Sequence, residues 1–174
     1  MAIVSMALIA APVITTSYAA GDDNPSPPAS SKKGKRKGTE LVPSEQSGQY
    51  TKFAEGYRAA YSTVYDRYDY ESAIRQLRAL DHDDYANVAN LIGYSYRKLG
   101  DYKQSQIWYE RALKSDPNHV LTWQYYGLWQ IEQGNRDQAM YHLQRIASIC
   151  GTACAEYRSL AEALEKPPGT GLVY

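Results

Sequence analysis

The sequence is poor in the residues that most catalytic and metal sites use. Its 174 residues include only three His, two Cys and a single Phe. His82, His119 and His142 share no metal-ligand spacing. There is also no Gly-rich phosphate loop, no nucleophile elbow and no pair of carboxylates in a catalytic pattern. We therefore predict no catalytic residues, no metal site and no cofactor.

An excess of one charge is missing as well. The 19 Lys and Arg balance the 19 Asp and Glu, and one basic cluster consists of Lys32, Lys33, Lys35, Arg36 and Lys37. The remainder is therefore mildly acidic, whereas a nucleic-acid-binding fold usually has a basic face, so we expect no nucleic-acid partner. The cluster is either a solvated tail or a weak contact for an anionic membrane, worth on the order of 1 kcal/mol per basic side chain.

The N-terminal apolar run is too short to cross a bilayer, which needs about 20 apolar residues. It covers residues 2–14, and Ser17 and Ala19 then occupy the small-residue positions that a signal peptidase accepts. We predict a signal peptide over residues 1–19, cleaved after Ala19, and a periplasmic or secreted protein. No Lys or Arg precedes the run, which leaves open a start codon further upstream.

The next segment, residues 20–48, is rich in Pro, Ser, Gly and charge. Such a composition offers too little apolar surface to offset the entropy of ordering, so we predict a disordered linker. Residues 167–174 are predicted to be a flexible tail.

Two windows of 34 residues, 86–119 and 120–153, align with each other. Gly93 then matches Gly127, and Gly100 matches Gly134. The motif residues of the first window are Ile92, Gly93, Tyr96, Gly100, Tyr102, Tyr109, Ala112 and Pro117. Those of the second are Trp123, Tyr126, Gly127, Gly134, Ala139 and Leu143. The spacing resembles the tetratricopeptide repeat, although Arg136 replaces a usual Tyr and Gly151 replaces the closing Pro.

This resemblance implies an all-α fold, a right-handed α-solenoid of about three helix hairpins with a C-terminal capping helix. We place the repeat domain at 49–166, with units at 49–83, 84–117 and 118–151 and the cap at 152–166. Gly93 and Gly127 are expected to let the second helix of each hairpin approach the first. Asp101, Asn135 and the acidic run at residues 81–84 are expected to cap helix N-termini.

The resemblance also implies a function. Proteins of this family are scaffolds whose concave face, lined by the first helices, holds a peptide or a partner's helix. The partner-binding residues that we predict on this face are Arg58, Tyr65, Asn87, Asn90, Tyr94, Arg97, Gln124 and Leu128. Some relatives hold a C-terminal carboxylate with a clamp of Lys and Asn, which Gln124 and Leu128 do not reproduce. We therefore predict a non-enzymatic scaffold for a protein or peptide in the bacterial cell envelope.

Cys150 and Cys154 are the only cysteines, and we predict a disulfide between them. Two Cα atoms one helical turn apart are within the range that a disulfide tolerates. One alternative is a redox or metal-handling accessory that uses this pair as working groups. Another is a structural subunit of an envelope assembly, for which Tyr94, Tyr125 and Trp129 are expected to be exposed.

Overall fold

A computed structural model describes the backbone of residues 44–167 and the side chains from residue 48 onward. The predicted signal peptide, the basic cluster and residues 168–174 of the predicted C-terminal tail lie outside these residues. Within them every regular element is a helix and no strand occurs, which confirms the all-α prediction. None of these helices is both long and apolar enough to cross a membrane.

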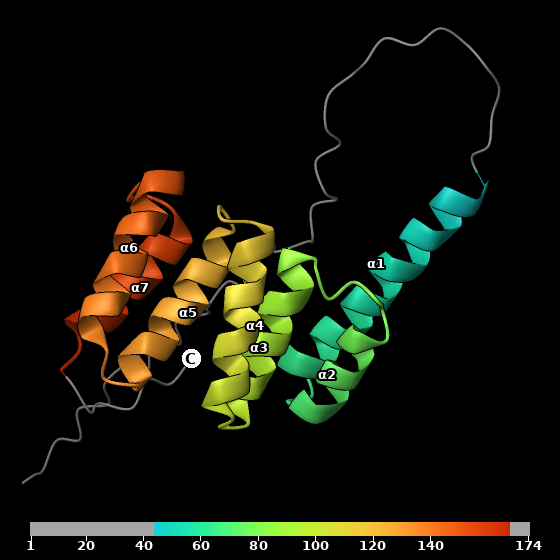
Figure 1. The fold of residues 1–174 in the computed structure, drawn as a ribbon, viewed down its shortest axis with the longest axis horizontal. Coiled ribbons are helices and arrows are strands. Elements are labelled where there is room, and N and C mark those ends of the chain that lie inside the picture. Colours follow the sequence, from blue (N-terminus) through green and yellow to red (C-terminus); the bar gives the residue numbers. More distant parts are fainter. Residues whose placement is uncertain (1–43, 168–174) are drawn as a thin grey trace, which may run out of the picture. The chain divides into compact units, whose positions relative to one another are not determined.

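Seven helices follow one another along the described chain (Figure 1). They are α1 (Ser44–Tyr65), α2 (Tyr70–Arg78), α3 (Ala86–Lys98), α4 (Tyr102–Ser115), α5 (Val120–Glu132), α6 (Arg136–Cys150) and α7 (Ala155–Glu165). The helix α1 begins at Ser44, inside the segment predicted to be a linker.

The helices form three hairpins and a cap. Each hairpin pairs consecutive helices, α1 with α2, α3 with α4 and α5 with α6, while α7 packs against both α5 and α6. The first helices also contact each other in series, from α1 to α3, from α3 to α5 and from α5 to α7 (Figure 1). The predicted stack of about three hairpins with a capping helix is therefore confirmed.

The core follows the lines along which these helices meet. In the first two hairpins it includes Val64, Leu77 and Ile92, all nearly or fully buried. At the other end, Leu160 and Leu164 of α7 pack into the cluster formed by α5 and α6. The capping helix therefore covers apolar surface that the last hairpin would otherwise expose.

Two helical glycines allow close packing, but against different partners. A Cβ on Gly93 would lie 2.8 Å from the ring of Tyr109, so this glycine lets α4 approach α3 as predicted. A Cβ on Gly127 would meet Leu160 of α7 at 2.5 Å, closer than any atom of α6. The Cβ of His142 in α6 would lie 3.3 Å away, so the prediction for Gly127 is confirmed for α6 but missed the closer contact with the capping helix.

The predicted helix caps agree only in part. Asp101 accepts a hydrogen bond from the backbone of Gln104 at 3.0 Å and caps α4. Asn135 stands at the N-cap of α6, but its side chain bonds to Gln130 instead. In the acidic run before α3, Asp83 contacts Arg78 and Arg111 and caps no helix.

Candidate functional site

The predicted partner-binding residues differ widely in exposure. Arg58 is exposed, and Tyr65, Asn87 and Gln124 are half-buried. The other four are buried inside the stack: Asn90, Tyr94, Arg97 and Leu128. Trp129 is buried and Tyr125 is half-buried, so the expectation of broadly exposed rings at Tyr94, Tyr125 and Trp129 was wrong for two of the three.

Four tyrosines join three successive first helices, and we call them the tyrosine cluster. Its members are Tyr61 and Tyr65 of α1, Tyr94 of α3 and Tyr125 of α5. The ring centroids are 4.4 Å apart for Tyr61 and Tyr65, 5.5 Å for Tyr65 and Tyr94, and 5.1 Å for Tyr94 and Tyr125. The hydroxyls of Tyr65 and Tyr125 lie 2.9 Å apart and share a hydrogen bond.

The cluster is electrically neutral. Burial, and then the neighbouring hydroxyl of Tyr125, raises the pKa of Tyr65 far above its ordinary value. Burial raises the pKa of Tyr94 in the same way. Both hydroxyls therefore stay protonated at physiological pH, and the cluster offers rings and hydroxyl groups without charge.

Arg97 is held by an ion pair within the stack. Its guanidinium donates two hydrogen bonds to the carboxylate of Glu132, at 2.8 and 2.7 Å. Burial opposes the charge on Arg97, but the hydrogen bonds and charge of Glu132 hold its pKa above the ordinary value. Arg97 therefore joins α3 to the end of α5, and its fork is already occupied.

Two further predicted residues also form hydrogen bonds that join one helix to another. The side chain of Asn87 bonds to His119 at 2.5 Å, between α3 and the N-cap of α5. Gln124 of α5 donates to Ser159 of α7 at 2.8 Å. Much of the predicted binding face is therefore used to hold each first helix to the next.

Asn90 and Leu128 lie deeper. Leu128 belongs to the apolar cluster between the last hairpin and the cap. Asn90 is 2% exposed, and its side-chain oxygen has no hydrogen-bond partner in the described part of the chain. Neither side chain presents surface to a ligand in this conformation.

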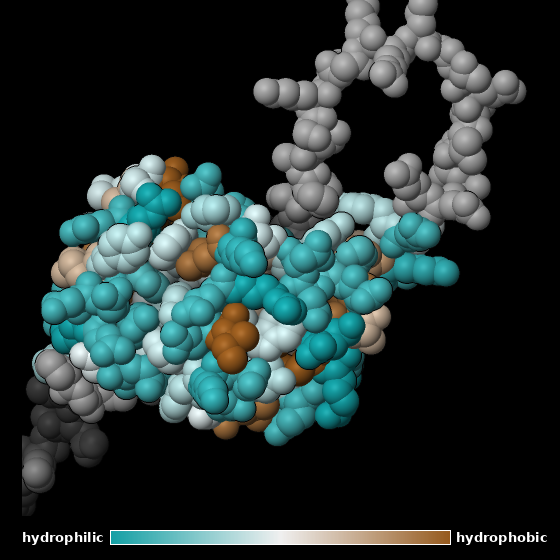
Figure 2. Space-filling model, viewed as in Figure 1, coloured by the Kyte–Doolittle hydropathy of each residue, from teal (hydrophilic) through white to brown (hydrophobic). Residues whose placement is uncertain are grey.

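Exposed hydrophobic side chains do not gather on one helix. Among the residues with described side chains, the large ones are Tyr50, Tyr68, Tyr85, Leu99, Tyr102, Ile107, Met140 and Tyr141. The face shown in Figure 2 is mainly hydrophilic with separate hydrophobic patches, one of them over α4. Scattered residues of this kind are ordinary on a soluble surface.

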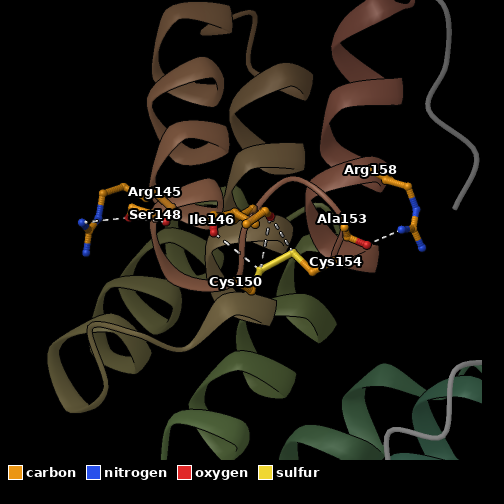
Figure 3. Close-up of a disulfide and its surroundings, with 8 residues drawn as sticks. Arg145, Ile146, Ser148, Cys150, Ala153, Cys154 and Arg158 are labelled. Atoms are coloured by element: carbon orange, nitrogen blue, oxygen red, sulfur yellow. Dashed lines mark hydrogen bonds between the residues drawn. A yellow bond between two sulfur atoms is a disulfide. The ribbon is translucent and has the colours of Figure 1, made fainter.

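The two cysteines meet at the joint before the cap (Figure 3). Cys150 is the last residue of α6 and Cys154 is the N-cap residue of α7. Their sulfurs lie at disulfide distance, 2.17 Å, with the Cα atoms 6.0 Å apart. Gly151 lies between them and has a φ of 81°, a backbone conformation that favours glycine. It stands where the repeat usually has its closing proline.

Comparison with known proteins supports the interpretation of the helix stack. Residues 86–119, which contain α3 and α4, match the family described as tetratricopeptide repeat. This chain contains a tetratricopeptide repeat. A search of curated proteins found no match.

Tetratricopeptide repeats generally mediate contacts between proteins, and the matched repeat therefore indicates an interaction scaffold. Sequence reasoning had missed Tyr61 and Glu132. It had also missed His119 and Ser159, the hydrogen-bond partners of Asn87 and Gln124. Only Tyr61 had a local signal, because Arg58, Tyr61 and Tyr65 recur at three and four residues on one stripe of α1. The others contribute through pairings with residues distant in the sequence.

Proposed function

We infer that the protein is a non-enzymatic scaffold that binds a peptide or a partner protein on the surface of its first helices. The observation that carries this proposal is the tyrosine cluster, which spans α1, α3 and α5 and in which three of the four residues are only partly buried. Tyrosine rings offer large contact area at a low entropy cost, and their hydroxyls bond to a peptide backbone.

Two exposed cations accompany the cluster. Arg58 precedes Tyr61 by three residues on α1, and the Lys98 amino group lies 5.9 Å from the ring centre of Tyr94. Because Arg97 is paired with Glu132, these two cations are the better candidates for an acidic group of the partner. A suitable ligand is an extended segment or helix with aromatic or apolar side chains and one acidic group.

The test is to place a photo-crosslinking amino acid at single positions of the full chain. One position is the exposed Glu55, three residues before Arg58 on α1, another is the half-buried Leu121 of α5, and Met140 is an exposed control on α6. We expect one defined protein to be captured from the first two positions and not from Met140. The same capture from Met140, or none from the first two, would contradict the proposal.

A charge reversal separates binding from folding. Arg58→Glu with Lys98→Glu changes two exposed side chains and no residue of the core. We expect the helical circular dichroism signal to remain and the crosslinked product to disappear. Persistence of the product would exclude these cations from the binding surface.

We propose in addition that the protein works in the bacterial cell envelope. Support comes from the apolar run at residues 2–14 and the small residues that end at Ala19. Mass spectrometry of the protein from fractionated cells should find a chain that begins at Ala20 in the envelope or periplasmic fraction. An uncleaved chain in the cytoplasmic fraction would contradict the location and leave the scaffold proposal untouched.

A further inference from the structure

Packing and hydrogen bonds hold the capping helix in addition to the disulfide between Cys150 and Cys154. Leu160 of α7 packs directly over Gly127 of α5. Hydrogen bonds from other helices hold both halves of α7: Gln124 donates to Ser159, and Arg136 donates to the backbone oxygen of Leu164. The disulfide closes only a four-residue step between two helices that are already packed together.

The two sulfurs stand at opposite ends of helices. Cys154 occupies the N-cap of α7, an 11-residue helix, and its side chain makes no capping hydrogen bond as a disulfide. A thiolate there would face the free N–H groups and the positive end of the helix dipole, which stabilise negative charge. Cys150 ends α6, where the dipole opposes a thiolate. The pair is therefore asymmetric.

Accessibility follows the same asymmetry. Cys150 is exposed and Cys154 is half-buried. An incoming thiolate therefore reaches Cys150 more easily, and the sulfur that is displaced is the one that the helix N-terminus stabilises. A leaving thiol of lower pKa leaves faster in thiol–disulfide exchange.

Glu156, Arg145 and Arg158 carry charge near the cysteine pair. The carboxylate of Glu156 lies within 4.8 Å of both sulfurs and opposes a thiolate by like charge. The guanidinium groups of Arg145 and Arg158 point away from the disulfide and bond to Ser148 and Ala153 (Figure 3). Among the described residues, Glu156 brings a carboxylate close to both sulfurs, and its removal gives a direct test.

We propose that Cys150 and Cys154 form a working dithiol–disulfide couple that accepts two electrons from a dithiol of another protein. A thiolate of that dithiol attacks the Cys150 sulfur, a mixed disulfide forms, and the bond to Cys154 breaks with its electron pair leaving on Cys154. The second thiol of the dithiol loses its proton and attacks its partner sulfur in the mixed disulfide. Cys150 leaves as a thiolate and takes up a proton. The dithiol becomes a disulfide, and the protein becomes a dithiol.

The first experiment measures equilibrium with glutathione. The full chain is incubated in mixtures of reduced and oxidised glutathione, and free thiols are counted by alkylation and mass spectrometry. We expect the pair to be partly reduced across these mixtures while the helical circular dichroism signal stays unchanged. A disulfide that resists a large excess of reduced glutathione, as structural disulfides do, or a chain that unfolds on reduction, would overturn the proposal.

The second experiment separates the two sulfurs. In Cys150→Ser, the remaining Cys154 should titrate below the ordinary thiol pKa of about 8.5, as followed by thiolate absorbance. In Cys154→Ser, Cys150 should titrate at or above that value and should form a mixed disulfide with glutathione. If Cys154 also titrates at or above it, the helix N-terminus gives no activation and the assignment fails.

The matched control uses two glutamates of α7. In the Cys150→Ser background, Glu156→Gln should raise the alkylation rate of Cys154 at neutral pH about threefold, which corresponds to roughly half a pKa unit. Glu162→Gln, at the far end of α7 beside Lys166, should leave this rate unchanged. Equal rates in all three backgrounds would show that no thiolate is tuned at this site.

Discussion

At the scale of the single residue, Arg97 shows how a side chain at a binding position of the repeat can be unavailable to a ligand. Only 3% of its side chain is exposed, and both prongs of its guanidinium contact Glu132. A partner with an acidic group would have to displace that carboxylate. The repeat pattern indicates Arg97 as a binding position. Its contacts, however, are determined by Glu132, which lies 35 residues later in the sequence.

Removing the charge of Glu132 should therefore affect stability. The variant Glu132→Gln keeps the shape of the side chain but leaves the buried guanidinium of Arg97 uncompensated. Since Glu132 is partly exposed, we expect the free energy of unfolding in urea to fall by roughly 2 kcal/mol, less than for a fully buried pair. Glu162→Gln, which loses only a surface pair with Lys166, should change it by less than about 0.5 kcal/mol. Equal effects would mean that the ion pair of Arg97 does not stabilise the stack.

His142 sets a pH dependence. It is 4% exposed between α5 and α6, and burial lowers its pKa to about 4 from the ordinary 6.5. Below pH 6.5 the unfolded chain therefore protonates His142 more readily than the folded chain does. The stability that neutral His142 contributes is fully present above pH 6.5 and is lost as the pH falls towards 4.

Between pH 7.5 and pH 5 this histidine should cost about 2 kcal/mol of unfolding free energy. The variant His142→Phe keeps a ring against Trp123 and Tyr126 and removes the titration. Urea unfolding at the two pH values should show a smaller pH effect in the variant. If the free energy of unfolding changed equally with pH in the variant and the natural protein, the acid sensitivity would belong to other groups.

At the scale of the helix, the sequence predicts whatever depends on neighbours along the chain. Gly100 and Gly134 end α3 and α5 with φ values of 79°, and Asp101 caps the next helix, so the hairpin boundaries could be derived from the motif. The closer partner of Gly127 could not, since it depends on how α7 docks. The start of α1 was also missed, because residues 44–48 have a composition typical of a linker.

The close approach of α3 and α4 gives a test at this scale. In Gly93→Ala the new Cβ would meet the buried ring of Tyr109 at 2.8 Å and the Ser105 carbonyl oxygen at 3.3 Å. We expect a loss of about 1–3 kcal/mol despite the better helix propensity of alanine. Gly48→Ala in α1 is the control, because nothing lies within 4 Å and the change should stabilise by up to about 1 kcal/mol. Chemical denaturation of both variants should give opposite signs, and a stabilising Gly93→Ala would contradict the packing described.

At the scale of the whole described stack, the candidate binding face was only partly predictable. The repeat register correctly placed Tyr65 and Tyr94 on the first helices. It could not show that Tyr65 would share a hydrogen bond with Tyr125, 60 residues away, or that Asn87 would bond to His119. Such pairs depend on the angle between successive hairpins, which no local pattern encodes. They also couple each hairpin to the next, so the stack should unfold as one unit.

The cap provides the last test of this coupling, by comparing its packing with its disulfide. Leu160→Ala removes a side chain that is 0% exposed and that contacts α5 at Gly127, so we expect a loss of about 3 kcal/mol. Replacing both Cys150 and Cys154 with Ser opens a very short loop and should cost no more than about 2 kcal/mol. Each variant should still unfold in a single transition that is the same by circular dichroism and tryptophan fluorescence, since α7 belongs to the same cooperative core as α5 and α6. If Leu160→Ala lost α7 in a separate early step, α7 would not belong to this cooperative core. If the double Ser variant were the less stable of the two, the disulfide and not the packing would hold the end of the stack. The cysteine pair would then be structural, and its proposed exchange with dithiols would fail with it.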